Sequence, residues 1–311
     1  MGYSLFAMLI LSTPIVSFGL KVNVIHKWKY CEYEWKSEQQ KEDAINSCTY
    51  DPYTCVLMQT KQKVNGRVFV TARRELDSGA PATLATVTHK TGPGGPLLRP
   101  YPDWSWHNSS CICNGIVNVY RVHIRCNHIF VLDNGQIGET NKQICNPKLL
   151  IFDLKNDMLV KTIYIPLDIA TNKTGSGLLV DVFVYVPNEK CTHFLDKMIV
   201  FMADSKGSGI VIYHSSRKHM CRVESDYMKP TNTTFLVDGD IFTYVGGIFS
   251  MTIMGDGKYS TFNIMNISTY WGQLTGLSNR FQKYALQTYN LSDINFRYFE
   301  MNLDEIFKKI N

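Results

Sequence analysis

The sequence predicts an all-β fold built from repeated short sheets. Two apolar runs of strand length, residues 128–132 and 149–152, are rich in β-branched and aromatic residues, and each is followed by Asp and other turn formers. The same unit recurs later, where residues 198–203 lead to Asp204, a Gly-rich turn and another apolar run at 210–213. A strand that ends in Asp, a turn and another strand is typical of a radially repeated sheet, which favours a β-propeller. Repetition alone leaves a β-sandwich open, because any all-β domain contains several such runs.

The N-terminal residues 1–19 predict a secretory signal peptide. Residues 3–18 are mostly apolar, too short to span a bilayer comfortably and interrupted by Pro14. Small residues before Leu20 suit cleavage at that point, although the usual basic residues are missing. Since no later segment is long and apolar enough for a membrane helix, we expect residues 20–311 to be secreted and extracellular, with no membrane span.

Residues 66–71 predict a further strand after a turn. The composition of the whole chain predicts a single domain. Hydrophobic residues make up 45% of the 311 residues, which is ample for a buried core, and no Pro- or Gly/Ser-rich linker divides the chain. The net charge of +5 is spread thinly. Nucleic-acid binding requires a concentrated basic face, so we expect no nucleic-acid partner.

The nine cysteines fit an oxidising compartment, where most of them should form disulfides. Their odd number leaves at least one thiol free or paired with another chain. Cys111 and Cys113 could also be read as metal ligands, but no second Cys pair or His pair lies at zinc-site spacing. Disulfides are therefore the preferred interpretation, and we expect no metal and no cofactor.

Sequons for N-glycosylation support the same secretory route. A modified Asn must lie on a solvated loop or strand edge. The candidate acceptors are Asn108, Asn172, Asn232, Asn266 and Asn290.

Several segments, taken in order, resemble the insect yellow and major royal jelly protein family. No single motif is decisive, but their number and order are specific, and the match covers most of residues 25–311. The segments are residues 66–74, similar to an early strand ending in Arg; 79–84, similar to Gly-Val-Pro-x-Thr-Leu; 96–104, similar to Pro-Leu-Leu-x-Pro-Tyr-Pro-x-Trp; 119–154, similar to the central signature; and 239–242 with 246–251, similar to a further blade.

The resemblance implies a secreted, glycosylated propeller of six blades. It also implies disulfides among Cys111 or Cys113, Cys126, Cys145 and Cys191, which match cysteines of the family signature, without fixing their connectivity. Relatives differ in activity, because some act on dopachrome, some bind biogenic amines in saliva and some are nutritive secretions. Fold therefore does not determine function here.

The end of the chain departs from the family pattern. Family members continue beyond the segment that residues 296–311 resemble, so we expect the last one or two blades to be missing. The alternatives are a smaller closed ring, an open arc that self-associates through its exposed edge, or a partial gene product. Residues 26–30 are expected near the closing seam of the ring.

A search for catalytic motifs finds no nucleophile elbow, phosphate loop or zinc-protease helix. His107 beside Trp104 and Trp106 suggests either an aromatic cation pocket or, preferably, buried aromatics. His214 and His219 lack a third metal ligand, so we interpret them as loop histidines. We assign no catalytic residue.

Asp133 and Asp204 are the best candidates for ligand contacts, because strand ends line the mouths of a propeller channel. The alternative is that each carboxylate bonds to its own turn backbone. Substitutions in the central signature favour a non-enzymatic protein that binds a small amine or sterol-like ligand, or a structural, salivary, venom or nutritive secretion. The alternative is a dopachrome isomerase of melanin synthesis.

Overall fold

In the computed structural model, antiparallel β-sheet is the main secondary structure of the described residues. The described residues are 22–62, 66–74, 79–107, 113–138, 140, 142–187, 190–230, 232–237, 239–243, 246–253, 259–262, 267–270 and 273–302. The predicted signal peptide, Asn108, Cys111 and Asn266 lie outside these residues.

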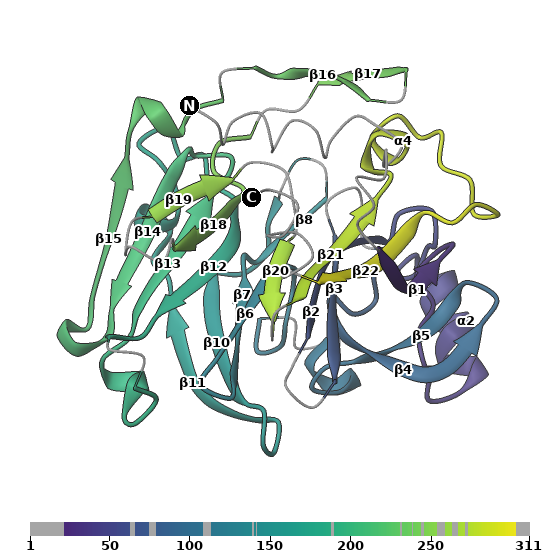
Figure 1. Cartoon of the computed structure of the whole chain (residues 1–311), viewed down its shortest axis with the longest axis horizontal. Coiled ribbons are helices and arrows are strands. Elements are labelled where there is room, and N and C mark those ends of the chain that lie inside the picture. The colour runs from purple at the N-terminus through teal and green to yellow at the C-terminus, as the bar shows by residue number, and fades with distance from the viewer. Residues whose placement is uncertain are drawn as a thin grey trace.

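Within these residues, four four-stranded sheets form blades of a propeller, so the prediction of an all-β propeller is confirmed (Figure 1). The first blade contains β2 (Val56–Gln62), β3 (Val68–Arg73), β4 (Leu84–Gly92) and β5 (Gly95–Pro100). The second contains β6 (Val119–Arg125), β7 (His128–Asp133), β10 (Lys148–Asp153) and β11 (Met158–Tyr164). The third contains β12 (Leu179–Tyr185), β13 (Ile199–Asp204), β14 (Gly209–His214) and β15 (His219–Glu224).

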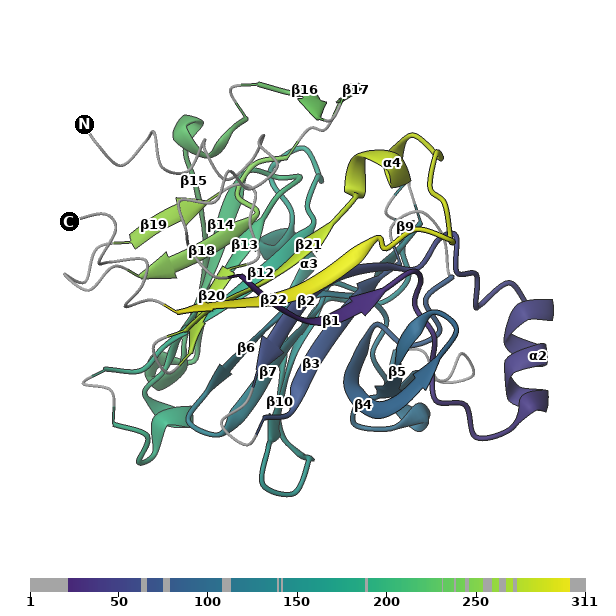
Figure 2. The same cartoon turned by 45° about the vertical axis from the view of Figure 1, so that its right-hand side comes forward.

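The fourth sheet joins the two ends of the described chain. We call it the closing sheet, and its strand β1 the closing strand. Its order is β1 (Asn23–Trp28), β22 (Phe296–Asn302), β21 (Gln273–Asn279) and β20 (Ile267–Tyr270). β1 pairs antiparallel with β22, and Trp28 lies opposite Phe296. Figure 2 shows β1 alongside β22, at the expected place of residues 26–30 near a seam between the termini.

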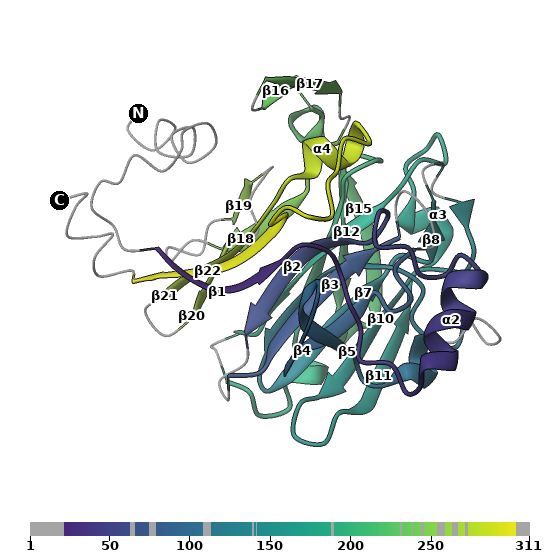
Figure 3. The ribbon, with the colours of Figure 1, turned by 90° about the vertical axis from the view of Figure 1, so that its right-hand side faces the viewer.

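The innermost strands of successive blades lie side by side. β2 contacts β21 on one side and β6 on the other, β6 contacts β12, and β12 contacts β18 (Ser250–Ile253). Figure 3 shows the same sheets from the side, with the closing sheet extending away from the first blade. The first strands of the first three blades, β2, β6 and β12, therefore lie next to one another.

Smaller elements connect the blades. The two-stranded sheets are β8 (Gln136–Ile137) with β9 (Lys142–Gln143), β16 (Thr234–Val237) with β17 (Asp240–Thr243), and β18 with β19 (Tyr259–Phe262). The described helices are α2 (Glu38–Asn46), α3 (Leu167–Ala170) and α4 (Phe281–Ala285), with 3₁₀ turns η1 (Trp104–His107), η4 (Phe194–Asp196), η5 (Ser215–Arg217) and η6 (Asp226–Met228). Among the described residues no helix has both the length and the apolar character needed to cross a membrane.

The core lies between the blades, where each apolar face is covered by its neighbour. Phe69 of the first blade packs with Val131 and Phe152 of the second. Phe130 of the second blade packs with Val182 of the third. This burial of apolar surface between sheets is the main stabilising term of the fold.

Candidate functional site

A cluster of charged and aromatic side chains lies where the first strands of three blades meet. It consists of Lys61 on β2, Arg121 and His123 on β6, Asp181 and Phe183 on β12, and Phe249 just before β18. We call these six residues the central cluster. Successive residues of a strand point to opposite faces of the sheet, so residues two apart share a face, as Arg121 and His123 do and as Asp181 and Phe183 do.

Asp181 is the only carboxylate of the central cluster and is held in place by backbone donors. Its Oδ1 accepts from the N–H of Val182 at 3.0 Å, and its Oδ2 accepts from the N–H of Met251 at 2.9 Å. Arg121 Nη1 lies 3.9 Å from Asp181 Oδ2, and the Arg121 guanidinium also lies 5.0 Å from the ring centre of Phe249. Burial raises the pKa of Asp181, and Arg121, the two N–H donors and Lys61 oppose that shift.

His123 and Lys61 make up the less buried side of the central cluster. The rings of His123 and Phe183 lie 4.9 Å apart in an edge arrangement. Burial, Lys61 and Arg125 hold the pKa of His123 well below its usual value, so the imidazole is neutral at pH 7. Burial also lowers the pKa of Lys61, with Asp181 opposing and Arg121 reinforcing that shift.

The central cluster combines two cationic side chains, one carboxylate, a neutral imidazole and two rings. Such an arrangement can hold a small aromatic molecule by its charged groups and its ring together. Sequence reasoning missed these residues. The available signal was the presence of charged side chains at alternate positions of otherwise apolar strands, but that signal does not reveal which strands are innermost.

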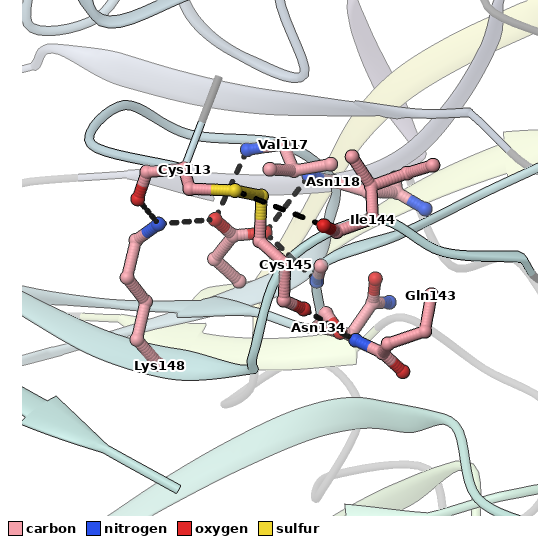
Figure 4. Close-up of a disulfide and its surroundings, with 10 residues drawn as sticks. Cys113, Val117, Asn118, Asn134, Gln143, Ile144, Cys145 and Lys148 are labelled. Carbon is pink, nitrogen blue, oxygen red and sulfur yellow. Dashed lines mark hydrogen bonds and ion pairs between the residues drawn. A yellow bond between two sulfur atoms is a disulfide. The ribbon is translucent and has the colours of Figure 1, made fainter. Parts of the chain in front are cut away.

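Asp133 ends β7 and is fully buried, and its partners Val117, Asn118 and Lys148 lie around the disulfide between Cys113 and Cys145 (Figure 4). Its carboxylate accepts from the N–H groups of Val117 at 3.0 Å, Asn118 at 2.9 Å and Gly135 at 3.1 Å. Lys148 Nζ lies 3.3 Å from Asp133 and donates to the carbonyl oxygen of Cys113 at 2.7 Å. The carboxylate thus ties the end of the second strand to the segment that enters the first strand of the same blade.

Asp204 has the equivalent place at the end of β13 and is also fully buried. It accepts from the N–H groups of Leu178 at 2.7 Å, Lys206 at 3.1 Å and Gly207 at 2.8 Å. Arg222 Nη2 donates to its other oxygen at 2.7 Å. This geometry favours the alternative interpretation, in which both Asp residues bond to turn backbone, and ligand contact by either one stays a prediction.

The structure contains disulfide bonds, as predicted. Cys113 is joined to Cys145 and Cys126 to Cys191, while Cys111 lies outside the described residues. The first bond links the segment before β6 to the segment before β10 within the second blade. The second links the β6–β7 turn to the loop before β13, and so connects the second blade with the third.

Of the predicted glycan acceptors, three are described. Asn232 and Asn290 are exposed and Asn172 is half-buried. Each of the three accepts, through its side-chain oxygen, an N–H from the sequon Ser or Thr two residues later, at 2.9–3.1 Å. All three lie in loops outside the strands, while their glycosylation stays a prediction.

The tryptophans on either side of His107 pack mainly against other aromatic rings. Trp104 stacks on Trp35 with ring centres 4.9 Å apart, and Trp106 meets Phe152 edge-on at 5.0 Å. The buried His107 imidazole bonds through Nε2 to the carbonyl oxygen of Tyr101 at 3.0 Å. Burial lowers its pKa to about 4.

Trp35 and Trp104 also line an open surface cavity of about 300 Å³, together with Glu34. Glu34 already forms ion pairs with Lys90 and Arg99, which lower the pKa of its carboxyl to about 2. This cavity is therefore a weaker candidate than the central cluster for a cationic ligand.

His214 and His219 face each other across the η5 turn, as the last residue of β14 and the first of β15. In the part of the chain that the structure describes, no group of three His, Cys, Asp or Glu side chains is arranged to hold a metal ion.

The fold and the central cluster define a β-propeller protein with a polar centre. Residues 117–269 match the family model described as major royal jelly protein. The chain is 35% identical over 236 residues to major royal jelly protein 8 of Apis mellifera, covering 75% of this chain and 55% of that one. It is 36% identical over 242 residues to major royal jelly protein 1 (76% and 54% covered) and 33% identical over 278 residues to major royal jelly protein 9 (87% and 63% covered), both of Apis mellifera.

The chain belongs to the yellow and major royal jelly protein family. It spans about half the length of the first of these relatives.

Proposed function

We propose that this protein is a secreted, glycosylated, non-enzymatic member of its family that binds a small aromatic amine at the central cluster. Secretion is supported by the disulfides and by the apolar N-terminal segment. The relatives are named as royal jelly proteins, which agrees with that route.

The observation that carries the ligand proposal is that the central cluster contains a buried carboxylate, Asp181, together with the rings of Phe183 and Phe249. An ammonium group can bond to the Asp181 carboxylate while the ligand ring packs against Phe183 or Phe249. An uncharged sterol-like ligand would instead cover Lys61 and Asp181 without bonding to them. Removing these charged groups from water without a new partner would cost binding free energy. The cluster therefore favours a biogenic amine over a sterol.

The charges of the central cluster refine the ligand class. Lys61 and Arg121 together exceed the single negative charge of Asp181. A ligand that carries a carboxylate as well as an ammonium group satisfies both signs, so an aromatic amino acid should bind more tightly than the amine derived from it.

Titration calorimetry with three matched catechols tests this proposal. L-dopa carries both charged groups, dopamine lacks the carboxylate, and 3,4-dihydroxyphenylpropanoic acid lacks the ammonium group. We expect L-dopa to bind most tightly, and Asp181→Asn to weaken L-dopa and dopamine by about tenfold or more while sparing the acid. Asp168→Asn, at an exposed position, is the matched control. Absence of binding heat with all three compounds contradicts the proposal.

One observation favours a second candidate function, dopachrome isomerisation. A neutral His123 within the central cluster could accept a proton, and tautomerisation is a proton transfer. The assay is the loss of dopachrome's visible absorbance with purified protein. We expect the rate of buffer alone; a faster rate that His123→Gln abolishes would replace the binding proposal with the enzymatic one.

A further inference from the structure

Two more cysteines meet in the core between the closing strand and the first blade. Cys31 follows β1, and Cys55 directly precedes β2. Both are fully buried. The Cys31 thiol donates to the carbonyl oxygen of Cys55 at 3.1 Å, and the hydroxyl oxygen of Tyr33 lies 3.6 Å from the Cys55 sulfur.

The surroundings of these thiols are aromatic. Tyr50 donates its hydroxyl to the carbonyl oxygen of Cys31 at 2.8 Å, and its ring meets that of Tyr33 edge-on at 6.1 Å. Burial raises the pKa of the Cys31 thiol far above its usual value, and the neighbouring Cys55 raises it further. A buried thiol of raised pKa is a poor nucleophile, so a catalytic role for this pair is not supported.

We infer that Cys31 and Cys55 form a third disulfide in the secreted protein. The inference rests on the secretory part of the proposed function and not on the ligand. The thiolate of one cysteine attacks an external disulfide, such as that of an oxidoreductase or of oxidised glutathione, and releases one thiol. The second cysteine then attacks the mixed disulfide and releases the other thiol, so the two cysteines lose two protons and two electrons while the external disulfide is reduced.

This exchange takes place during folding. In the folded protein both sulfurs are inaccessible, so an external disulfide can reach them only before the segment after β1 closes against β2. The bond would span 24 residues, including α2, and would fasten the segment that follows the closing strand to the first strand of the first blade.

Peptide mapping without reduction tests the inference. Protein secreted from a eukaryotic host is alkylated under denaturing conditions and digested with trypsin and Asp-N protease. The analysis uses samples in which the disulfides Cys113–Cys145 and Cys126–Cys191 are both present. We expect residues 30–36 joined to residues 51–61, at the sum of the two masses less two hydrogens. Alkylation of both Cys31 and Cys55, or a bond from either one to another cysteine or to glutathione, overturns the inference.

The design separates this inference from the proposed function. If Cys113, Cys126, Cys145 and Cys191 are all alkylated in the secreted protein, the secretory assignment fails instead. A stability comparison gives independent evidence, using Cys31→Ala, Cys55→Ala and the double variant. If the bond exists, each single variant loses as much stability as the double variant, because either substitution removes the whole bond. Losses that add in the double variant indicate two separate thiols and overturn the inference.

Discussion

Two buried carboxylates, Asp133 and Asp204, show how single residues organise this fold. Each ends the second strand of its blade and accepts N–H groups from the segment entering the first strand. Their place at strand ends could be predicted from the sequence, because Asp follows an apolar run in both cases. Their complete burial could not, since it depends on Lys148 and Arg222, which reach them from other strands.

Asp204→Asn should destabilise the protein by about 3–5 kcal/mol. The amide NH2 replaces one accepting oxygen by a donor, which must face either the backbone N–H groups or Arg222, and the buried negative charge that pairs with Arg222 is lost. Urea unfolding measures the change. Asp226→Asn is the control, because Asp226 pairs with Lys229 at the exposed surface and its loss should leave the midpoint unchanged. Equal effects of the two substitutions would contradict this assignment.

His107 should make stability depend on pH. The unfolded imidazole takes up a proton below its ordinary pKa of about 6.5, whereas in the folded protein the pKa is about 4. The unfolded state therefore binds more protons between these values, so stability is full above pH 6.5 and falls as the pH drops toward 4. The loss amounts to roughly 3 kcal/mol.

Chemical denaturation of the wild type and His107→Gln, from pH 7 to pH 4, measures this dependence. The variant keeps a donor for the carbonyl of Tyr101 but does not titrate, so its stability should fall less steeply over that range. Parallel pH profiles for the two proteins would show that His107 is not the titrating group.

At the scale of elements, several strands in the middle of their sheets could be predicted from the sequence, but the strands that pair with them could not. The runs at 66–71, 128–132, 149–152, 198–203 and 210–213 lie within or overlap β3, β7, β10, β13 and β14. Local composition determines these strands because β3, β7 and β10 are buried on both faces, and β14 alternates between buried and half-buried residues. The pairing of β1 with β22 joins segments that are distant in sequence, and only a resemblance to a family indicated it.

The contact between β1 and the β4–β5 turn gives a test of the closing strand. Gly95 has a φ of +131°, and a Cβ there would lie 2.6 Å from the carbonyl oxygen of Lys27 and 2.9 Å from Trp28. Gly66 also has a positive φ, +79°, but a Cβ there would meet open space. Gly66→Ala should therefore cost about 1–2 kcal/mol, from backbone strain alone.

Gly95→Ala should cost clearly more than Gly66→Ala, because it also displaces β1. Urea unfolding gives the two losses, and hydrogen exchange shows whether β1 amides lose protection only in Gly95→Ala. If both variants lose the same stability and β1 stays protected, the strand does not depend on this contact.

At the scale of the whole molecule, one disulfide fastens two segments of the second blade and the other connects the second blade with the third. The bonds Cys113–Cys145 and Cys126–Cys191 close loops of 32 and 65 residues. Chain entropy predicts a contribution of about 4 kcal/mol from each. Replacing either pair by Ser should lower the unfolding free energy by an amount of that order, whereas a change under 1 kcal/mol would show that the unfolded chain is already restricted.

The central cluster forms only when the blades are assembled. Lys61, Arg121 and Asp181 come from three blades, and nothing in their local sequence shows that β2, β6 and β12 are neighbours. The sequence therefore allowed the family and the propeller to be predicted, while the candidate site required the arrangement of the blades.

Hydrogen exchange with and without L-dopa locates the ligand on the fold. We expect L-dopa to slow exchange in β6, β12 and the segment around Phe249, and Asp181→Asn to remove this protection. Protection confined to the surface cavity around Trp35 and Trp104, or no protection in any segment, would contradict binding at the central cluster.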